Sequence, residues 1–348
     1  MIEVKSHKKY GVVLIGCGHI GEEHARDIFF RDQIHLVGVV DADQKKAREF
    51  KMRFGAQSFG SSYKEFLQRK DVDIFIIATY AGAHLEIMTE CLRYGKHVLC
   101  EKPMATTMED AAKFYTIVKK SECKMLISHV LRYNETYQTA SRIIHSGEIG
   151  KIKVMRMVQN HHCKDWDRYK RLLTDCPPVI DCGVHYADVM QWFTGSRIIG
   201  VSGFGAVVDE DVPEGTYNYG VMNAYLEDGS VGYYEAGWSR TLHSCNVRQF
   251  VGDRGRLSIT LNNMRTQNAE EGDLIEIYLK DRNEYKTLNV QSKYKNMWAL
   301  MESLIDMIES DCAPLCSIED AFSAFRVVWN ADQAIRNRKY ITIGSLEG

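Results

Sequence analysis

The chain has 348 residues, of which 45% are hydrophobic and 26% charged, and its formal net charge is −2. This composition is typical of a soluble globular protein, and the length exceeds one ordinary core, so it predicts two domains. The balanced charge argues against nucleic acid or an anionic membrane as a partner.

The cysteines and the N-terminal segment indicate the cellular compartment in which the protein is expected. Ten cysteines are scattered without a repeating spacing, which predicts reduced thiols in a cytoplasmic protein. The apolar run that follows the N-terminal basic residues is too short for a signal-peptide core or a membrane span. "HHC" at 161–163 and the pair Cys312 and Cys316 have no companion ligand cluster. We therefore predict structural roles for them and no metal site.

The first 130 residues alternate two patterns. Short apolar runs predict buried strands, and segments of 3.6-residue periodicity predict helices between them. The predicted strands lie within 11–16, 35–41, 73–79, 96–100 and 124–130, and the predicted helices within 22–30, 45–54 and 83–95. Alternating strands and helices predict a doubly wound parallel α/β sheet, a Rossmann domain over residues 1–130.

The regular alternation of predicted strands and helices ends after about residue 130. A helix over about 134–147 precedes a long extended run at 152–163, and a second helix is expected near 183–194. Hairpin signals follow, one of them around Asp228-Gly229, and two helices close the chain. We predict an α+β domain over residues 131–348, with an open, mostly antiparallel sheet that carries helices on one side.

The sequence "VVLIGCGHIG" places Gly16, Gly18 and Gly21 in the spacing of a dinucleotide-binding turn between a strand and a helix. The helix N-terminus offers N–H groups to a pyrophosphate. Asp41 ends the next strand, about 20 residues later, where a carboxylate accepts a ribose hydroxyl and repels a 2′-phosphate. NAD is thus favoured over NADP. The alternatives are an ordinary glycine turn and, for Asp41, a helix cap.

"CEKP" follows the fifth predicted strand, at the carboxyl edge where ligands of open α/β sheets bind. This position predicts that Lys102 lies near a nicotinamide ring, although a surface lysine paired with Glu101 is the alternative. In the later segment 179–195, Asp181 and His185 are one helical turn apart. Histidine suits proton transfer near neutral pH, and Gly183 leaves room for another group to approach closely. A helix cap and an interfacial histidine remain the alternatives there.

The motifs "GCGHIG", "EKP" and "DCGVHYAD", in this order and at this separation, resemble the Gfo/Idh/MocA family, which is named after glucose–fructose oxidoreductase, inositol 2-dehydrogenase and a rhizopine-catabolism protein. The resemblance covers essentially the whole chain and implies a catalytic group of Lys102, Asp181 and His185. It also implies a sugar or cyclitol bound against the sheet of the second domain, and a homodimer or homotetramer formed through the other face of that sheet.

The predicted cofactor-binding residues are Gly16, Gly18, His19, Ile20, Gly21, Asp41, Ala78, Thr79, Tyr80, His84, Glu101 and Lys102. The predicted substrate residues are Arg132, Asn160, His162, Trp166, Arg168, Tyr169, Cys182 and Trp238. Successive strand residues face opposite ways, so at most one of His161 and His162 lines a pocket. A strand end followed by a surface loop is the alternative for 159–170. The chain departs from the family at "TYAGAH", where many members carry Thr-Pro-Asn, and at Pro177-Pro178, where many are glycine-rich.

We therefore expect an NAD-dependent oxidoreductase that acts on a secondary alcohol of a neutral sugar or cyclitol. His185 is the predicted proton acceptor, Lys102 the group that stabilises the alcohol oxygen, and Asp181 the residue that orients His185 or binds an adjacent hydroxyl. One alternative is a glycoside-cleaving enzyme that oxidises its sugar transiently with bound NAD. The other, against which this residue set argues, is a nucleotide-binding regulator without catalytic activity.

Overall fold

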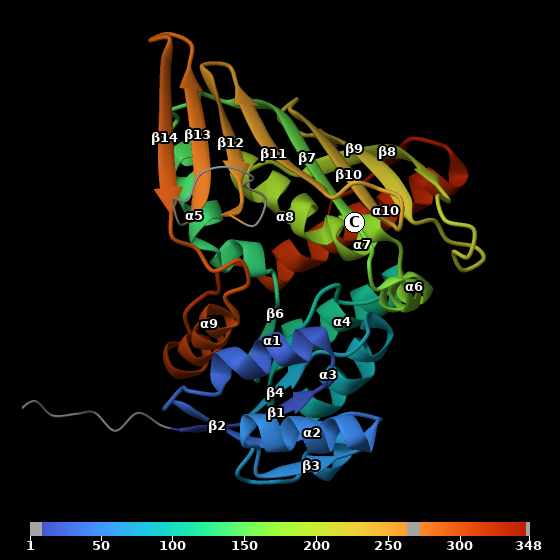
Figure 1. Cartoon of the computed structure of the whole chain (residues 1–348). Coiled ribbons are helices and arrows are strands. Elements are labelled where there is room, and N and C mark those ends of the chain that lie inside the picture. Colours follow the sequence, from blue (N-terminus) through green and yellow to red (C-terminus); the bar gives the residue numbers. More distant parts are fainter. Residues whose placement is uncertain (1–8, 263–271, 346–348) are drawn as a thin grey trace, which may run out of the picture. The chain divides into compact units, whose positions relative to one another are not determined.

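The structure is a computed structural model that describes residues 9–262 and 272–345 (Figure 1). The chain forms two compact units. The first unit comprises residues 1–130 and 295–319, and the second comprises residues 131–294 and 320–348.

The first unit is built on a six-stranded parallel sheet in the order β3-β2-β1-β4-β5-β6. Its strands are β1 (Tyr10–Ile15), β2 (Ile34–Val40), β3 (Ser58–Gly60), β4 (Ile74–Ile77), β5 (His97–Cys100) and β6 (Met125–Ile127). β1 and β4 are buried at every position, as their apolar runs predict for strands covered on both faces. The predicted parallel α/β sheet is confirmed.

Helices connect these strands. They are α1 (His19–Ile28), α2 (Gln44–Phe54), α3 (His84–Arg93) and α4 (Met108–Lys120), with two short 3₁₀ turns, η1 (Tyr63–Glu65) and η2 (Ala81–Ala83). The strand order reverses between β1 and β4, and crossovers between parallel strands are right-handed. Consequently α1 and α2 cover one face of the sheet, while α3 and α4 pack together on the other.

One later segment also belongs to the first unit. Helix α9 (Met297–Ser310) packs against α1, and the Asp27 carboxylate accepts the backbone N–H groups of Met297 and Trp298 at 3.0 and 3.3 Å. Asp27 thus satisfies two N–H groups that a helix N-terminus leaves without partners. The predicted domains 1–130 and 131–348 differ from the observed units in this segment, residues 295–319.

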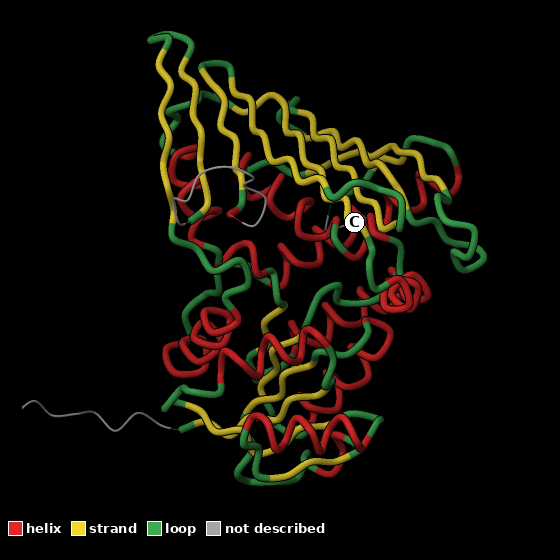
Figure 2. The backbone as a smooth tube through the Cα atoms, viewed as in Figure 1, coloured by secondary structure: helices red, strands yellow, loops and turns green. Residues whose placement is uncertain are grey.

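The second unit contains a nine-stranded sheet in the order β14-β13-β12-β11-β7-β10-β9-β8-β15, drawn as yellow strands in Figure 2. Its strands are β7 (Ile152–His162), β8 (Ile198–Ala206), β9 (Tyr219–Leu226), β10 (Val231–Ser239), β11 (Cys245–Gly252), β12 (Gly255–Thr260), β13 (Asp273–Leu279), β14 (Glu284–Val290) and β15 (Ile341–Thr342). Every neighbouring pair is antiparallel except β7 and β10. The predicted open, mostly antiparallel sheet and its hairpin at Asp228-Gly229 are confirmed.

Helices cover one face of this sheet (Figure 1). They are α5 (Glu135–His145), α7 (Pro178–Asp181), α8 (Gly183–Thr194) and α10 (Ile318–Asn337), after a 3₁₀ turn η3 (Val130–Tyr133). Helix α6 (Trp166–Asp175) follows β7 and lies beyond the end of that strand (Figure 1). The helix-covered face carries fully buried side chains such as Met157, Tyr234 and Phe250. No helix within residues 9–262 and 272–345 combines the length and hydropathy needed to cross a membrane.

Candidate functional site

The glycine loop of the first unit joins β1 to α1. Gly16 has φ +100°, and a Cβ there would lie 2.4 Å from the Ala78 carbonyl oxygen; a Cβ at Gly21 would lie 1.9 Å from the Gly16 carbonyl oxygen. A Cβ at Gly18 would meet nothing within 4 Å. Two glycines therefore allow close packing of the backbone, while Gly18, the N-cap of α1, keeps open space in front of the helix N-terminus.

Asp41 lies beside this loop at the end of β2. Its Oδ2 accepts the backbone N–H of Cys17 at 2.8 Å, and its Oδ1 accepts that of Asp43 at 2.9 Å. These bonds orient the carboxylate against the loop. Burial, and next the charge of Asp41, raise the pKa of the Cys17 thiol to about 12, so this cysteine stays a neutral thiol at pH 7.

The predicted cofactor residues after β4 and β5 also belong to the first unit. Ala78 and Thr79 lead into η2, where the Tyr80 side chain is 51% exposed. His84 is fully buried, and its ring nitrogens lie 2.9 Å from the Pro103 carbonyl oxygen and 3.1 Å from that of Thr79. Glu101 is buried, and Lys102 is partly exposed.

These residues fit a dinucleotide. The open space at Gly18 and the N-terminus of α1 suit a pyrophosphate, and His19 and Ile20 open that helix. The Asp41 carboxylate suits a ribose hydroxyl. The carboxyl ends of β1, β2, β4 and β5 share one edge of the parallel sheet, which is the edge where such ligands bind.

In the second unit, Asp181 ends α7 and His185 lies in the first turn of α8. Cys182 between them keeps right-handed helical backbone angles (φ −85°, ψ −36°), so Asp181 and His185 stay one turn apart as predicted. A Cβ at Gly183 would lie 3.0 Å from the Tyr234 ring, which confirms that this glycine admits a close neighbour. Pro177 is the N-cap of α7, and Pro178 is its first residue.

An aromatic cluster lies on the helix-covered face beside this segment. Tyr169 of α6 meets Trp238 edge-on, with ring centroids 5.5 Å apart, and its hydroxyl lies 2.9 Å from Nδ1 of His161. Burial raises the pKa of Tyr169 to about 12, with Asp181 and Cys182 contributing repulsion. Burial likewise raises the pKa of Tyr234, with the same two residues nearby. Tyr169 and Tyr234 therefore stay protonated near Asp181.

Three buried polar atoms on this face have no hydrogen-bond partner among the described residues. They are Oε1 of Gln159, the hydroxyl of Tyr234 and Nε1 of Trp238. In the paired strands β7 and β10, Gln159 lies opposite Ala236 and His161 opposite Trp238. Sequence reasoning missed Gln159 and Tyr234, and it chose His162 over His161. Strand alternation from Trp238 would have found Tyr234, and the pairing of β10 with β7 was needed for Gln159 and His161.

Two predicted substrate residues lie on the other face of the sheet. Asn160 is opposite Gly237 and His162 opposite Ser239 in the β7–β10 pair, one residue out of step with Trp238. Asn160 donates to Glu235 at 2.6 Å. The choice of His162 over His161 therefore does not fit a site that also contains Tyr169 and Trp238.

The remaining predicted substrate residues already have partners. Arg132 donates to both carboxylate oxygens of Asp188, at 2.9 and 2.7 Å, and both residues are buried. Trp166 donates to Asp211 at 2.9 Å. The Arg168 guanidinium lies 5.7 Å from the centroid of the Tyr169 ring, and the Cys182 thiol lies 3.6 Å from the Asp181 carboxylate.

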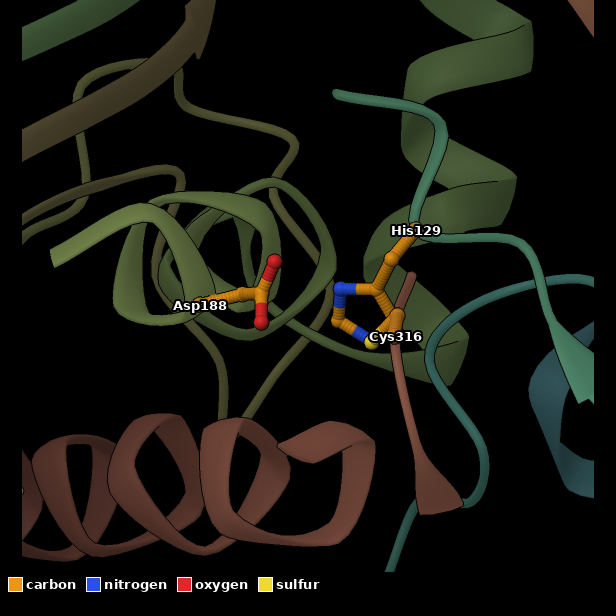
Figure 3. Close-up of side chains that lie close together, drawn as sticks. All are labelled: His129, Asp188 and Cys316. Atoms are coloured by element: carbon orange, nitrogen blue, oxygen red, sulfur yellow. The ribbon is translucent and has the colours of Figure 1, made fainter. Parts of the chain in front are cut away.

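Figure 3 shows His129, Cys316 and Asp188 as sticks. His129 and Cys316 both belong to the first unit, and their possible ligand atoms lie within 4.8 Å of each other. Two ligand atoms are fewer than the four of a structural zinc site. Asp188 belongs to the second unit, where the Arg132 guanidinium already neutralises its carboxylate.

Comparisons with known proteins agree with this architecture. Residues 10–129 match a family described as an oxidoreductase family with an NAD-binding Rossmann fold, and residues 137–258 match the GFO/IDH/MocA C-terminal domain. The chain is 23% identical to myo-inositol 2-dehydrogenase of Thermotoga maritima, over 96% of this chain and 99% of that protein. It is 25% identical to scyllo-inositol 2-dehydrogenase (NAD(+)) of Bacillus subtilis, over 74% and 75%.

Solved structures show the same fold. Myo-inositol 2-dehydrogenase from Lactobacillus plantarum has a TM-score of 0.82 at 19% identity, covering 97% of this chain and all of that one. A levoglucosan dehydrogenase in complex with NADH and levoglucosan also has a TM-score of 0.82, at 18% identity with the same coverage. The two matched regions and the two observed sheets lead to one conclusion: the chain is an oxidoreductase of the Gfo/Idh/MocA family.

Proposed function

We propose that the protein is an NAD-dependent dehydrogenase that acts on a secondary alcohol of a cyclitol or neutral sugar. The observation that carries the proposal is the position of Asp181 and His185, one turn apart on α7–α8 beside the cluster of Tyr169, Tyr234 and Trp238. The inositol dehydrogenases among its relatives support the substrate class.

The first unit would hold the cofactor through the loop of Gly16, Gly18 and Gly21 and through Asp41. When bound, the nicotinamide ring supplies the hydride acceptor. The Asp41 carboxylate supports NAD over NADP, because its charge repels a 2′-phosphate. Asp43, two residues later, adds a second negative charge.

The proposed catalytic group is Lys102, Asp181 and His185. His185 takes the proton from the substrate hydroxyl, since imidazole is the side chain best suited to proton transfer at neutral pH. The Lys102 ammonium donates a hydrogen bond to the same oxygen and stabilises the negative charge that develops there. Asp181 orients His185 or accepts a neighbouring substrate hydroxyl. Lys102 belongs to the first unit and the other two to the second, and their joint action stays a prediction.

The polar atoms of the second unit favour a polyol. Gln159 Oε1 can only accept and Trp238 Nε1 can only donate, whereas the Tyr234 hydroxyl can do both. A ring that carries several hydroxyl groups can form hydrogen bonds with all three, because a hydroxyl both donates and accepts. Leaving each group without a partner costs about 1–3 kcal/mol, so a ligand that satisfies them gains affinity. Of the predicted substrate residues, Tyr169, Cys182 and Trp238 lie on this side of the sheet.

The proposal is tested with a panel of cyclitols, sugars and glycosides, assayed for NADH absorbance and for released aglycone. Net NADH formation with myo-inositol, scyllo-inositol or a neutral sugar supports the dehydrogenase. Aglycone release without net NADH would indicate the glycoside-cleaving alternative. If neither NADH nor aglycone appears, the nucleotide-binding regulator is the remaining alternative. Lys102→Met and His185→Asn should each lower kcat by about 100-fold or more. A selective loss of NAD affinity with kcat intact would contradict the assigned roles.

We also propose a homodimer or homotetramer formed through the face of the nine-stranded sheet that helices leave bare. Strand register places Tyr225, Val231 and Val154 side by side on that face, across β9, β10 and β7, and their side chains are 42%, 39% and 41% exposed. Exposed apolar patches of this kind mark association sites. Light scattering of the wild type and of Tyr225→Lys distinguishes an oligomer that dissociates from a chain that is monomeric throughout.

A further inference from the structure

Glu101, the residue before Lys102, is a carboxylate buried directly after β5. Its side chain Oε1 lies 2.8 Å from Nε2 of His24, which is 1% exposed on α1. The backbone N–H of Lys102 donates to Oε2 of the same carboxylate at 3.3 Å. His24 thus ties the residue that precedes Lys102 to the helix that follows the glycine loop.

His84 holds the residue on the other side of Lys102. Its Nδ1 lies 2.9 Å from the Pro103 carbonyl oxygen and its Nε2 lies 3.1 Å from the Thr79 carbonyl oxygen, and the side chain is fully buried. A carbonyl oxygen only accepts hydrogen bonds, so each ring nitrogen has to donate. An imidazole donates from both nitrogens only in its protonated form. In that form His84 joins the segment after β4 to the segment after β5.

The fold alone does not require these ionisable groups. Val98, Leu99 and Cys100 of β5 are all fully buried, and replacing a buried ion pair by apolar side chains of similar volume is often neutral or stabilising. Burial alone would raise the pKa of Glu101, but the hydrogen bond and charge of His24 outweigh it, and the pKa is lowered. Glu101 is therefore kept ionised at a position where an apolar residue would serve packing as well.

We propose that His24 and His84 are positioning residues for Lys102, which fix the backbone on its two sides and thereby the position of its Cα, from which the side chain extends. The proposal rests on the role of Lys102 in the proposed function. A lysine side chain has four rotatable bonds, so the position of its Cα sets where the charge can reach. A displacement of about 1 Å in a catalytic group can cost about 100-fold in rate.

The test uses the full-length protein with leucine and glutamine at each position. His24→Leu and His84→Leu remove the donors, and we expect kcat on the best polyol of the panel to fall by about 100-fold. In His24→Leu, which changes none of the predicted cofactor residues, KM for NAD should stay at the wild-type value. His24→Gln keeps one N–H donor for Glu101 and should recover part of kcat. His35→Gln is the matched control, because His35 lies at the other end of the same sheet, at the start of β2, and should leave kcat unchanged.

A folded His24→Leu or His84→Leu variant with wild-type kcat overturns the proposal, as does a rise in KM for NAD with kcat intact. A readout independent of activity is ¹⁵N NMR of the histidine rings at pH 7, in which both nitrogens of His84 should carry protons. A neutral His84 ring overturns the proposed anchoring even if a leucine variant fails to fold. If the wild type oxidises no polyol but His84 is doubly protonated, the proposed dehydrogenase function is wrong. The proposed anchoring of residues 101–103 then still stands.

Discussion

Gly18→Ala and Gly21→Ala, two substitutions in the same loop, should impair different properties of the protein. In Gly18→Ala the new methyl group meets no protein atom within 4 Å, and φ is −91°, which alanine adopts without strain. In Gly21→Ala the new Cβ would lie 1.9 Å from the Gly16 carbonyl oxygen. A carbon and an oxygen ordinarily approach to about 3.3 Å. In the second variant only, these two atoms must therefore separate by about 1.4 Å, which moves the helix away from the strand.

The magnitudes follow from this geometry. Overpacking of this kind costs about 1–3 kcal/mol, and the better helix propensity of alanine offsets about 1 kcal/mol. The blocking atom is a backbone carbonyl oxygen that cannot rotate aside, so the upper end of the overpacking range applies, and Gly21→Ala should lose about 2 kcal/mol of stability without cofactor. In Gly18→Ala the weaker N-cap and the smaller entropy of the unfolded chain nearly cancel, and stability should stay within about 1 kcal/mol of wild type. Its methyl group instead occupies the space proposed for the pyrophosphate.

The assay combines thermal unfolding without cofactor and calorimetric titration with NAD. Gly18→Ala should keep the wild-type melting temperature and lose about tenfold or more in NAD affinity, which corresponds to about 1.4 kcal/mol. Gly21→Ala should lose both stability and NAD affinity. Its melting temperature should be lower by about 4–8 °C, at 2–4 °C per kcal/mol. If Gly18→Ala binds NAD as the wild type does, the space in front of α1 is not where a dinucleotide phosphate binds, and the cofactor assignment loses its main support.

Three further predictions concern single carboxylates. Asp27→Ala should lower the unfolding free energy by about 1–2 kcal/mol, because two N–H groups at the start of α9 lose their acceptor, and Asp27→Asn should lose less in the same denaturant titration. The lowered pKa of Glu101 means that its stabilisation is present above the unfolded-state pKa of about 4.3 and is lost as the pH falls through the lower folded value. The gap in melting temperature between wild type and Glu101→Gln should therefore be widest near pH 7 and close below about pH 4; a constant gap contradicts this. Asp41→Ser should raise the kcat/KM ratio of NADP to NAD, because the charge that repels a 2′-phosphate is gone.

Sequence periodicity was sufficient for much of the fold because the relevant physics is local. The buried runs of β1 and β4 and the glycine spacing at Gly16, Gly18 and Gly21 follow from rules that act within a few residues. The one-turn separation of Asp181 and His185 is likewise local, and the helical backbone at Cys182 preserves it.

What the sequence could not supply depends on partners far along the chain. Whether His161 or His162 joins Tyr169 is decided by the register of β7 with β10, about 75 residues later. Arg132 looked available for a substrate, but Asp188 binds it from 56 residues away. The packing of α9 with the first unit depends on Asp27, about 270 residues earlier. No periodic pattern encodes such pairs.

The distribution of polar groups on the nine-stranded sheet distinguishes residues that serve packing from residues that packing does not explain. On its helix-covered face, Met155, Met157 and Ala236 are fully buried and apolar, as packing against helices requires. Gln159 and Trp238, farther along the same two strands, each bury a polar atom with no partner among the described residues. Folding gains nothing from such atoms, since each costs about 1–3 kcal/mol. The change from apolar to polar occurs where β7 and β10 approach Tyr169 of α6, and the polyol of the proposed function, bound at those strand ends, would account for it.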